Sequence, residues 1–72
     1  MEQVIKMLVK QFARKGLTED EISFCIGSLW SIIMDPNVKS CEDLNLEMKA
    51  AGWKNIELNE ETFKIVSSVF AT

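Results

Sequence analysis

Two kinds of side chain in this sequence could do chemistry: the cysteine thiols and the neighbouring pairs of acids. Cys25 and Cys41 stand sixteen residues apart, and a thiol attacks a substrate or binds a metal only as the thiolate. Adjacent carboxylates can serve as general acid and base, or hold a hard cation such as Mg²⁺. The adjacent acids are Glu19 with Asp20, Glu42 with Asp43, and Glu60 with Glu61. These thiols and carboxylates are the first candidates for a catalytic or metal site.

The surroundings of these side chains argue against catalysis. The chain has no His and no Tyr, and its three glycines are isolated, so it offers no imidazole base and no phosphate-binding loop. Each pair of acids falls in or beside the first turn of a predicted helix, where the helix dipole favours negative charge. Cys25 lies near an apolar stripe, and Glu42 opposes thiolate formation at Cys41. We therefore predict no catalytic residue, no metal site, no cofactor and no small-molecule substrate.

Hydrophobic periodicity predicts an all-α, small compact four-helix domain that occupies residues 1–72 as one unit. The predicted helices cover residues 2–15, 18–34, 41–51 and 59–71. Residues 53–58 are expected to form a short extended segment, and the sequence leaves open whether it pairs as a strand. Because 72 residues make only a small core, good helix packing or self-association must stabilise the domain.

Residues at the helix ends set these boundaries. Thr18 is followed three residues later by Glu21, which is the spacing of a capping box. Gly16 and Gly52 suit the left-handed position that follows a helix, and Pro36 ends the second helix. The residues expected to cap the second, third and fourth helices are Thr18, Ser40 and Asn59.

The net charge and the longest apolar run argue against two classes of function. The net charge is −3, which disfavours nucleic acid as the main partner. The run Ile22–Met34 carries no charge but is only thirteen residues long, whereas a membrane-spanning helix needs about 20. The opening MEQVIKML lacks the long apolar region of a targeting peptide. We expect a cytoplasmic protein with no transmembrane segment, encoded as a small bacterial or phage protein.

The stretch KGLTEDEISFCIG at residues 15–27 resembles the first half of a bacterial repressor-type helix-turn-helix. The matching residues are Leu17, Thr18, Glu21 and Ile22. The resemblance covers about thirteen residues, and it implies a turn near Gly27 followed by a helix that reads DNA. The stretch SLWSIIMDPNV comes next and has no Arg or Lys for contacts with bases or phosphates. A degenerate helix-turn-helix nucleic-acid-binding regulator is therefore the alternative hypothesis.

The predicted second helix carries apolar or small residues on nearly every side. Its main apolar stripe is Ile22, Ile26, Leu29 and Ile33, and its stripe of small residues is Ser23, Gly27 and Ser31. A helix of this kind tends to be buried all round, and the other three helices could enclose it, unless Ser23, Gly27 and Ser31 simply face solvent. The alternative is that the small residues let a helix of another chain approach closely.

A large apolar side chain left outside the core would mark an interface with a protein partner. The candidate interface residues are Phe24, Trp30, Ile32 and Trp53, together with Ser23, Gly27 and Ser31. Lys6, Lys10 and Arg14 form a row on the polar side of the first helix, and we call them the basic strip, which would orient a partner. The sequence therefore predicts a non-enzymatic small helical protein–protein interaction module that acts as a regulator or accessory protein. Its partner would be another protein or a second copy of itself in a homodimer.

Overall fold

The computed structural model describes residues 2–70 and contains four helices and no strand within that range. Their bounds are α1 Glu2–Arg14, α2 Glu19–Ile33, α3 Cys41–Ala50 and α4 Glu60–Phe70. The predicted all-α four-helix domain is confirmed, and the predicted helices differ from these bounds by one residue or so at their ends. The predicted end of the fourth helix at residue 71 lies outside the described residues.

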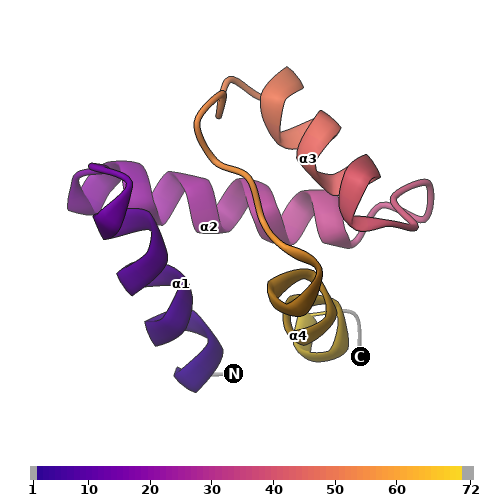
Figure 1. The fold of residues 1–72 in the computed structure, drawn as a ribbon, viewed down its shortest axis with the longest axis horizontal. Coiled ribbons are helices and arrows are strands. Elements are labelled where there is room, and N and C mark those ends of the chain that lie inside the picture. Colours follow the sequence, from indigo (N-terminus) through magenta and orange to yellow (C-terminus); the bar gives the residue numbers. More distant parts are fainter. Residues whose placement is uncertain (1, 71–72) are drawn as a thin grey trace.

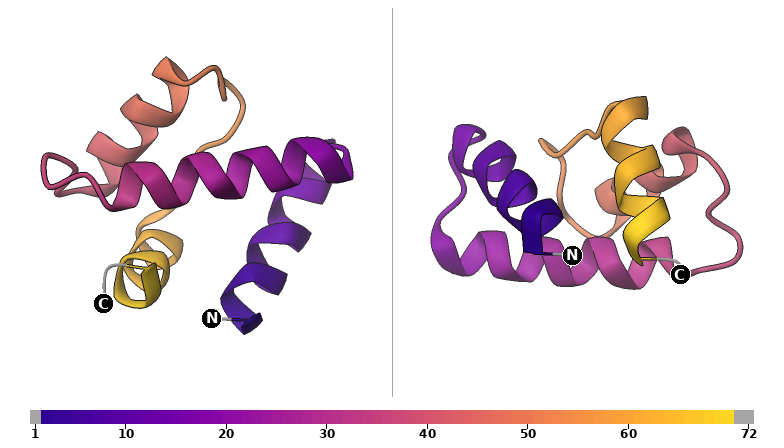
Figure 2. Two further views of the ribbon diagram at one scale, coloured as in Figure 1. Left: turned by 180° about the vertical axis from the view of Figure 1, so that it is seen from behind. Right: turned by 90° about the horizontal axis from the view of Figure 1, so that it is seen from below.

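Helix α2 is the element on which the others assemble. It is the longest of the four at 15 residues, and it packs against α1, α3 and α4, while α1 also packs on α4 (Figure 1). The segment between α3 and α4 crosses α2 on the same side as these contacts (Figure 1). Viewed from behind, α2 is uncovered, and viewed from below it forms one edge of the domain (Figure 2). The other helices therefore do not enclose α2, because all three lie against one side of it, and Ser23, Gly27 and Ser31 are exposed on the far side.

The core lies between this inner side of α2 and the other elements. Each helix contributes one apolar face, and the segment between α3 and α4 contributes two side chains. The buried cluster contains Leu8, Phe12, Ile22, Cys25, Leu29, Ile33, Leu44, Met48, Ile56, Leu58, Val66 and Phe70. Leu29, near the middle of α2, is 0% exposed. The apolar stripe predicted for the second helix is thus the side that faces the core, except that Ile26 is only partly buried.

Side-chain caps begin three of the helices as predicted. At the start of α2, the Thr18 hydroxyl accepts from the Glu21 backbone N–H at 3.3 Å, and the Glu21 carboxylate accepts from the Thr18 N–H at 2.9 Å. This reciprocal pair satisfies two backbone donors that the helix itself leaves free. Ser40 caps α3, and Asn59 accepts from the backbone N–H of Thr62 in the first turn of α4. The predicted helix starts are therefore confirmed.

The glycine after α3 allows the chain to turn sharply back towards the core. Gly52 adopts a φ of 101°, a region that costs a residue with a Cβ but not glycine. The turn lets the Trp53 N–H donate to the carbonyl of Met48 at 2.9 Å, the bond that defines a Schellman motif. Trp53 then packs against the core. The sequence-based prediction of a glycine cap at this helix end is confirmed.

Residues 53–58 do not form a strand. The chain turns at Lys54 and Asn55, and then inserts Ile56 and Leu58 into the core. A buried backbone needs hydrogen-bond partners, and here a side chain supplies them. Asn45 Oδ1 accepts from the Leu58 N–H at 2.9 Å, and Asn45 Nδ2 donates to the Leu58 carbonyl at 3.0 Å. The amide of Asn45 therefore takes the place that a neighbouring strand would have occupied.

Candidate functional site

The side of α2 that faces away from the core is bare and carries large apolar side chains. At about 100° per residue, Gly27 lies at the centre of this side. Phe24 is 72% exposed, Met34 is 56% exposed and Trp30 is 42% exposed. We call this surface the outer face, and its residues are Asp20, Ser23, Phe24, Gly27, Trp30, Ser31 and Met34. The outer face contains five of the seven residues that the sequence suggested for an interface.

A shallow hollow beside the outer face is lined by apolar and small residues. It lies between α2 and the end of α3, and we call it the apolar hollow. Its lining residues are Ser23, Phe24, Gly27, Ser28, Ser31, Ile32 and Ala51. Ile32 is mostly buried and packs against the core from this position. The hollow offers a surface on which an apolar side chain of a partner could rest beside the Phe24 ring.

Gly27 has no packing role within the chain. A Cβ built on it meets no atom within 4 Å, and its φ is not positive. Alanine favours a helix interior over glycine by about 1 kcal/mol. We therefore expect Gly27→Ala to raise the free energy of unfolding by about 0.5 to 1 kcal/mol in urea denaturation followed by circular dichroism.

Gly52→Ala is the matched control for that measurement. Because Gly52 has a φ of 101°, alanine there is strained and should lower the free energy of unfolding. A loss of stability in Gly27→Ala would mean that the outer face is packed against another part of the chain.

A second hollow lies beside the first turn of α2 and carries two carboxylates. It is lined by Val9, Glu19, Asp20, Ile22 and Ser23, and we call it the acidic hollow. Val9 and Ile22 supply apolar surface, while Glu19 and Asp20 are exposed at its border. Ser23 lines both hollows, so the acidic hollow and the apolar hollow are neighbours along α2.

Trp30 is held in place on the outer face by an aromatic contact. Its ring stacks on Phe70 of α4 with the centroids 5.0 Å apart and the planes 22° from parallel. Phe70 is buried, so the contact ties the indole to the core. Trp53, which the sequence grouped with Trp30, lies elsewhere: it is mostly buried and lines a separate hollow with Leu17 and Glu21.

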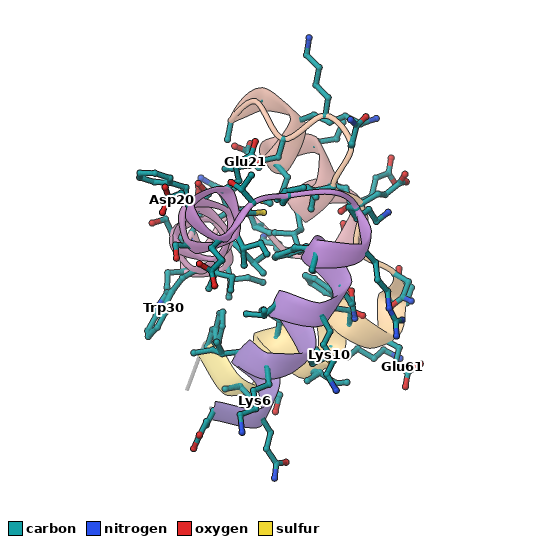
Figure 3. All side chains as sticks on the ribbon, turned by 90° about the vertical axis from the view of Figure 1, so that its left-hand side faces the viewer. Lys6, Lys10, Asp20, Glu21, Trp30 and Glu61 are labelled. Atoms are coloured by element: carbon teal, nitrogen blue, oxygen red, sulfur yellow. The ribbon has the colours of Figure 1, made fainter. Side chains whose placement is uncertain are left out.

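The basic strip lies along α1 and away from the outer face. Lys6, Lys10 and Arg14 are all exposed, and Lys6 Nζ lies 3.7 Å from a carboxylate oxygen of Glu2. Figure 3 shows Lys6 and Lys10 on α1, whereas Asp20 and Trp30 project from the outer side of α2. An exposed pair such as Lys6 with Glu2 contributes little to stability. The strip and the outer face could therefore be contacted together only by a partner that wraps round the domain.

Both cysteine thiols are buried and held in the protonated form. Burial raises the pKa of Cys25 to about 11. Burial, followed by the negative charge of Glu60, raises the pKa of Cys41 above its ordinary value. Cys41 Sγ also donates a hydrogen bond to the Leu58 carbonyl at 3.0 Å, so the thiol proton helps to hold the segment that precedes α4. These thiols act as core side chains, and neither is set up as a nucleophile at neutral pH.

The raised pKa of Cys25 gives stability a pH dependence in the alkaline range. In the unfolded chain the thiol ionises near its ordinary pKa of 9.0, while in the folded chain it keeps its proton until about 11. The folded state then binds more protons than the unfolded state, so the free energy of unfolding should fall as pH rises from 9 to 11. Urea denaturation at several pH values should show a steeper fall for the natural chain than for Cys25→Ala. Equal slopes in the two proteins would contradict a buried, protonated Cys25.

Residues 2–70 offer neither a cluster of metal-binding side chains nor a helix that could cross a membrane. No group of three or more His, Cys, Asp or Glu side chains in that range is arranged to hold a metal ion. None of the four helices has the length and apolar character required to cross a bilayer.

No family model, curated protein or solved structure matches the chain. The resemblance to a repressor-type helix-turn-helix can be compared with the fold directly. Helix α2 runs without a break from Glu19 to Ile33, and Gly27 lies inside it. The turn that the resemblance implies near Gly27 is therefore absent.

Some residues of the outer face and of the acidic hollow are not among those that the sequence suggested for an interface. The helix dipole alone accounts for Glu19 and Asp20 in the sequence, yet in the structure both also line the acidic hollow. Val9 on α1 is 39% exposed and lines the same hollow as these acids, and the sequence gives no sign of that contact between two helices. A helical wheel of α2 would have grouped Asp20 and Met34 with Gly27, because each lies within about 20° of Gly27.

Proposed function

We propose that this chain is a non-enzymatic protein-interaction module that binds another polypeptide through the outer face of α2. The observation that carries the proposal is the 72% exposure of Phe24 on a side of α2 that no other element covers. Met34 and Trp30 extend the same apolar surface. Contiguous exposed apolar residues of this kind commonly mark a site of protein contact. We propose for the chain a role as a regulator or accessory protein in the cytoplasm.

The outer face has features that favour binding energetically. Complete burial of a side chain such as Phe24 contributes about 1.5 to 3 kcal/mol. Trp30 is already restrained by its stacking on Phe70, so it loses little conformational freedom on binding. Aromatic residues, tryptophan above all, are common among the side chains that dominate protein interfaces. The protonated state of both thiols supports a binding role over a catalytic one.

Nucleic acid is a poorer candidate for the outer face. The residues Glu19–Ile33 include no Lys or Arg, and Glu19, Asp20 and Glu21 place three acids at the start of α2. Phosphates would be repelled from this end of the surface. The unbroken course of α2 through Gly27 also favours the interaction module over the helix-turn-helix alternative.

Site-specific photocrosslinking tests the proposal. A benzophenone amino acid placed at position 24 should form adducts with a polypeptide when the protein is irradiated in the cells that make it. The control carries the same group at position 46, because Leu46 is 59% exposed on α3 but lines a different hollow, with Glu57 and Lys49. We expect protein adducts from position 24 and few or none from position 46. Absence of any polypeptide adduct at position 24 would overturn the proposed function.

A further inference from the structure

We infer that the polypeptide that binds the outer face is a cationic amphipathic helix; this deepens the proposed function and rests on it. The first argument is charge. Helix α2 has no basic residue, and Glu19 and Asp20 are exposed beside its outer face. In the part of the chain that the structure describes, the only ion pair joins Lys6 to Glu2, so these two carboxylates are unpaired.

The acidic hollow has the form that a long basic side chain requires. Val9 and Ile22 give it apolar lining, and the exposed acids Glu19 and Asp20 line it as well. A Lys or Arg side chain lays its methylene stem on apolar surface and keeps its charged group among polar atoms. A cation from the partner would therefore be held by contact along its stem and by two carboxylates at its end.

The outer face fits a helix better than an extended chain. Ser23, Gly27 and Ser31 follow one another at intervals of four residues, so they form a ridge of small side chains about 12 Å long. Small residues allow the backbone of a second helix to come close. Phe24 flanks the ridge beside the apolar hollow, and Trp30 flanks it on the other side. An extended partner would find no sheet edge here, because residues 2–70 contain no strand.

Charge also argues against a second copy of this chain as the occupant. An antiparallel α2 pair centred on Gly27 would bring Glu19 and Asp20 of one copy level with Asp35 of the other. A parallel pair would bring Asp20 of both copies together. The chain's own basic helix α1 cannot fill the site either, because its apolar side chains Leu8 and Phe12 are buried in the core. The occupant must therefore bring its cations from another protein.

A designed peptide pair tests the inference with the full chain. The probe is a helical peptide of about 18 residues with leucines along one face and lysines along the other, labelled with a fluorophore. Its twin has glutamate in place of every lysine. Fluorescence anisotropy should show that the lysine peptide binds at least about tenfold more tightly than its twin. Its affinity should also fall as salt rises from about 0.05 to 0.5 M.

Matched variants separate docking on the outer face from general attraction to an acidic protein. Asp20→Asn and Phe24→Ala should each weaken binding of the lysine peptide about fivefold or more. Gly27→Leu should weaken it as well, by filling the ridge where the helix would approach. Glu61→Gln removes an exposed acid from the first turn of α4, far from Asp20 in Figure 3, and should have little effect. Circular dichroism confirms that each variant is folded.

Several outcomes would overturn the inference, and they differ from failure of the proposed function. Equal binding of both peptides, or an equal loss in Asp20→Asn and Glu61→Gln, would show that the acidic hollow has no special part. Self-association that buries Phe24, detected by light scattering, would identify a second copy as the occupant. If the lysine peptide fails to bind while position 24 still crosslinks to a polypeptide, the inference is wrong and the proposed function stands.

Discussion

Leu29→Ala is expected to lower the free energy of unfolding by about 3 to 4 kcal/mol. Leu29 is 0% exposed and lies in the core between α2 and the elements packed on its inner side. Truncating it removes apolar contacts and leaves a cavity that neighbouring residues fill only in part. Because a domain of 72 residues is only marginally stable, a substantial fraction of this variant should be unfolded at 25 °C. Thermal and urea denaturation followed by circular dichroism measure the effect.

Phe24→Ala is the matched control on the same helix. Phe24 has the larger side chain, but it is 72% exposed, so its removal should change the free energy of unfolding by no more than about 0.5 kcal/mol. The contrast between Leu29 and Phe24 follows from the two sides of α2. If Phe24→Ala destabilised the chain as strongly as Leu29→Ala, the outer face would be packed, and its assignment as a binding surface would fail.

Asn45→Ala is expected to lower the free energy of unfolding by about 1 to 3 kcal/mol. The Asn45 side chain accepts from the Leu58 N–H and donates to the Leu58 carbonyl, and Leu58 is buried. Alanine at this position leaves the buried N–H without a partner, and a buried polar group without one costs about 1 to 3 kcal/mol. Cys41 still donates to the Leu58 carbonyl in this variant, so the carbonyl keeps a donor and the unsatisfied group is the Leu58 N–H. Urea denaturation of the variant measures the loss.

Asn55→Ala tests whether the loss is specific to that amide. Asn55 lies in the same connection but is exposed, so its replacement should change stability by less than about 0.5 kcal/mol. Similar stabilities for Asn45→Ala and Asn55→Ala would show that the segment at Leu58 is held by its apolar side chains alone.

The features predicted correctly from the sequence are those decided by residues close together in the chain. The capping box of Thr18 and Glu21 spans three residues, and the turn at Gly52 involves only its neighbours. The local conformational preferences of these residues agree with the final fold, so helix starts and stops could be predicted without knowledge of packing. The same holds for the core stripe of α2, whose period is that of the helix.

The features that the sequence did not predict depend on contacts between distant residues. The wide apolar arc of α2 includes both Leu29 and Phe24, and only the docking of α1, α3 and α4 decides which of them is buried. Asn45 gives no local sign that its amide will hold Leu58, thirteen residues away. Asp20 is favoured by the helix dipole and also lines the acidic hollow. Because the dipole alone explains an acid in the first turn of a helix, the sequence does not reveal the hollow.

Helix α2 thus has two separate roles. Its inner side organises the core, and its outer side remains free for a partner. The three helices on the inner side are enough to bury Leu29 and its neighbours. The opposite side keeps Phe24, Trp30 and Met34 exposed. The acids at the start of α2 then determine which charge a partner must carry.

The most direct test of the central claim, that a partner helix binds the outer face of α2, is a map of backbone amide chemical shifts. The isotopically labelled chain would be titrated with the leucine–lysine peptide and followed by heteronuclear NMR. We expect little change along the basic strip of α1 and the largest shifts at Asp20, Ser23, Phe24, Gly27 and Ser31. Shifts that cluster on α4 or around Leu46, or saturable binding that leaves the α2 amides unchanged, would contradict that claim.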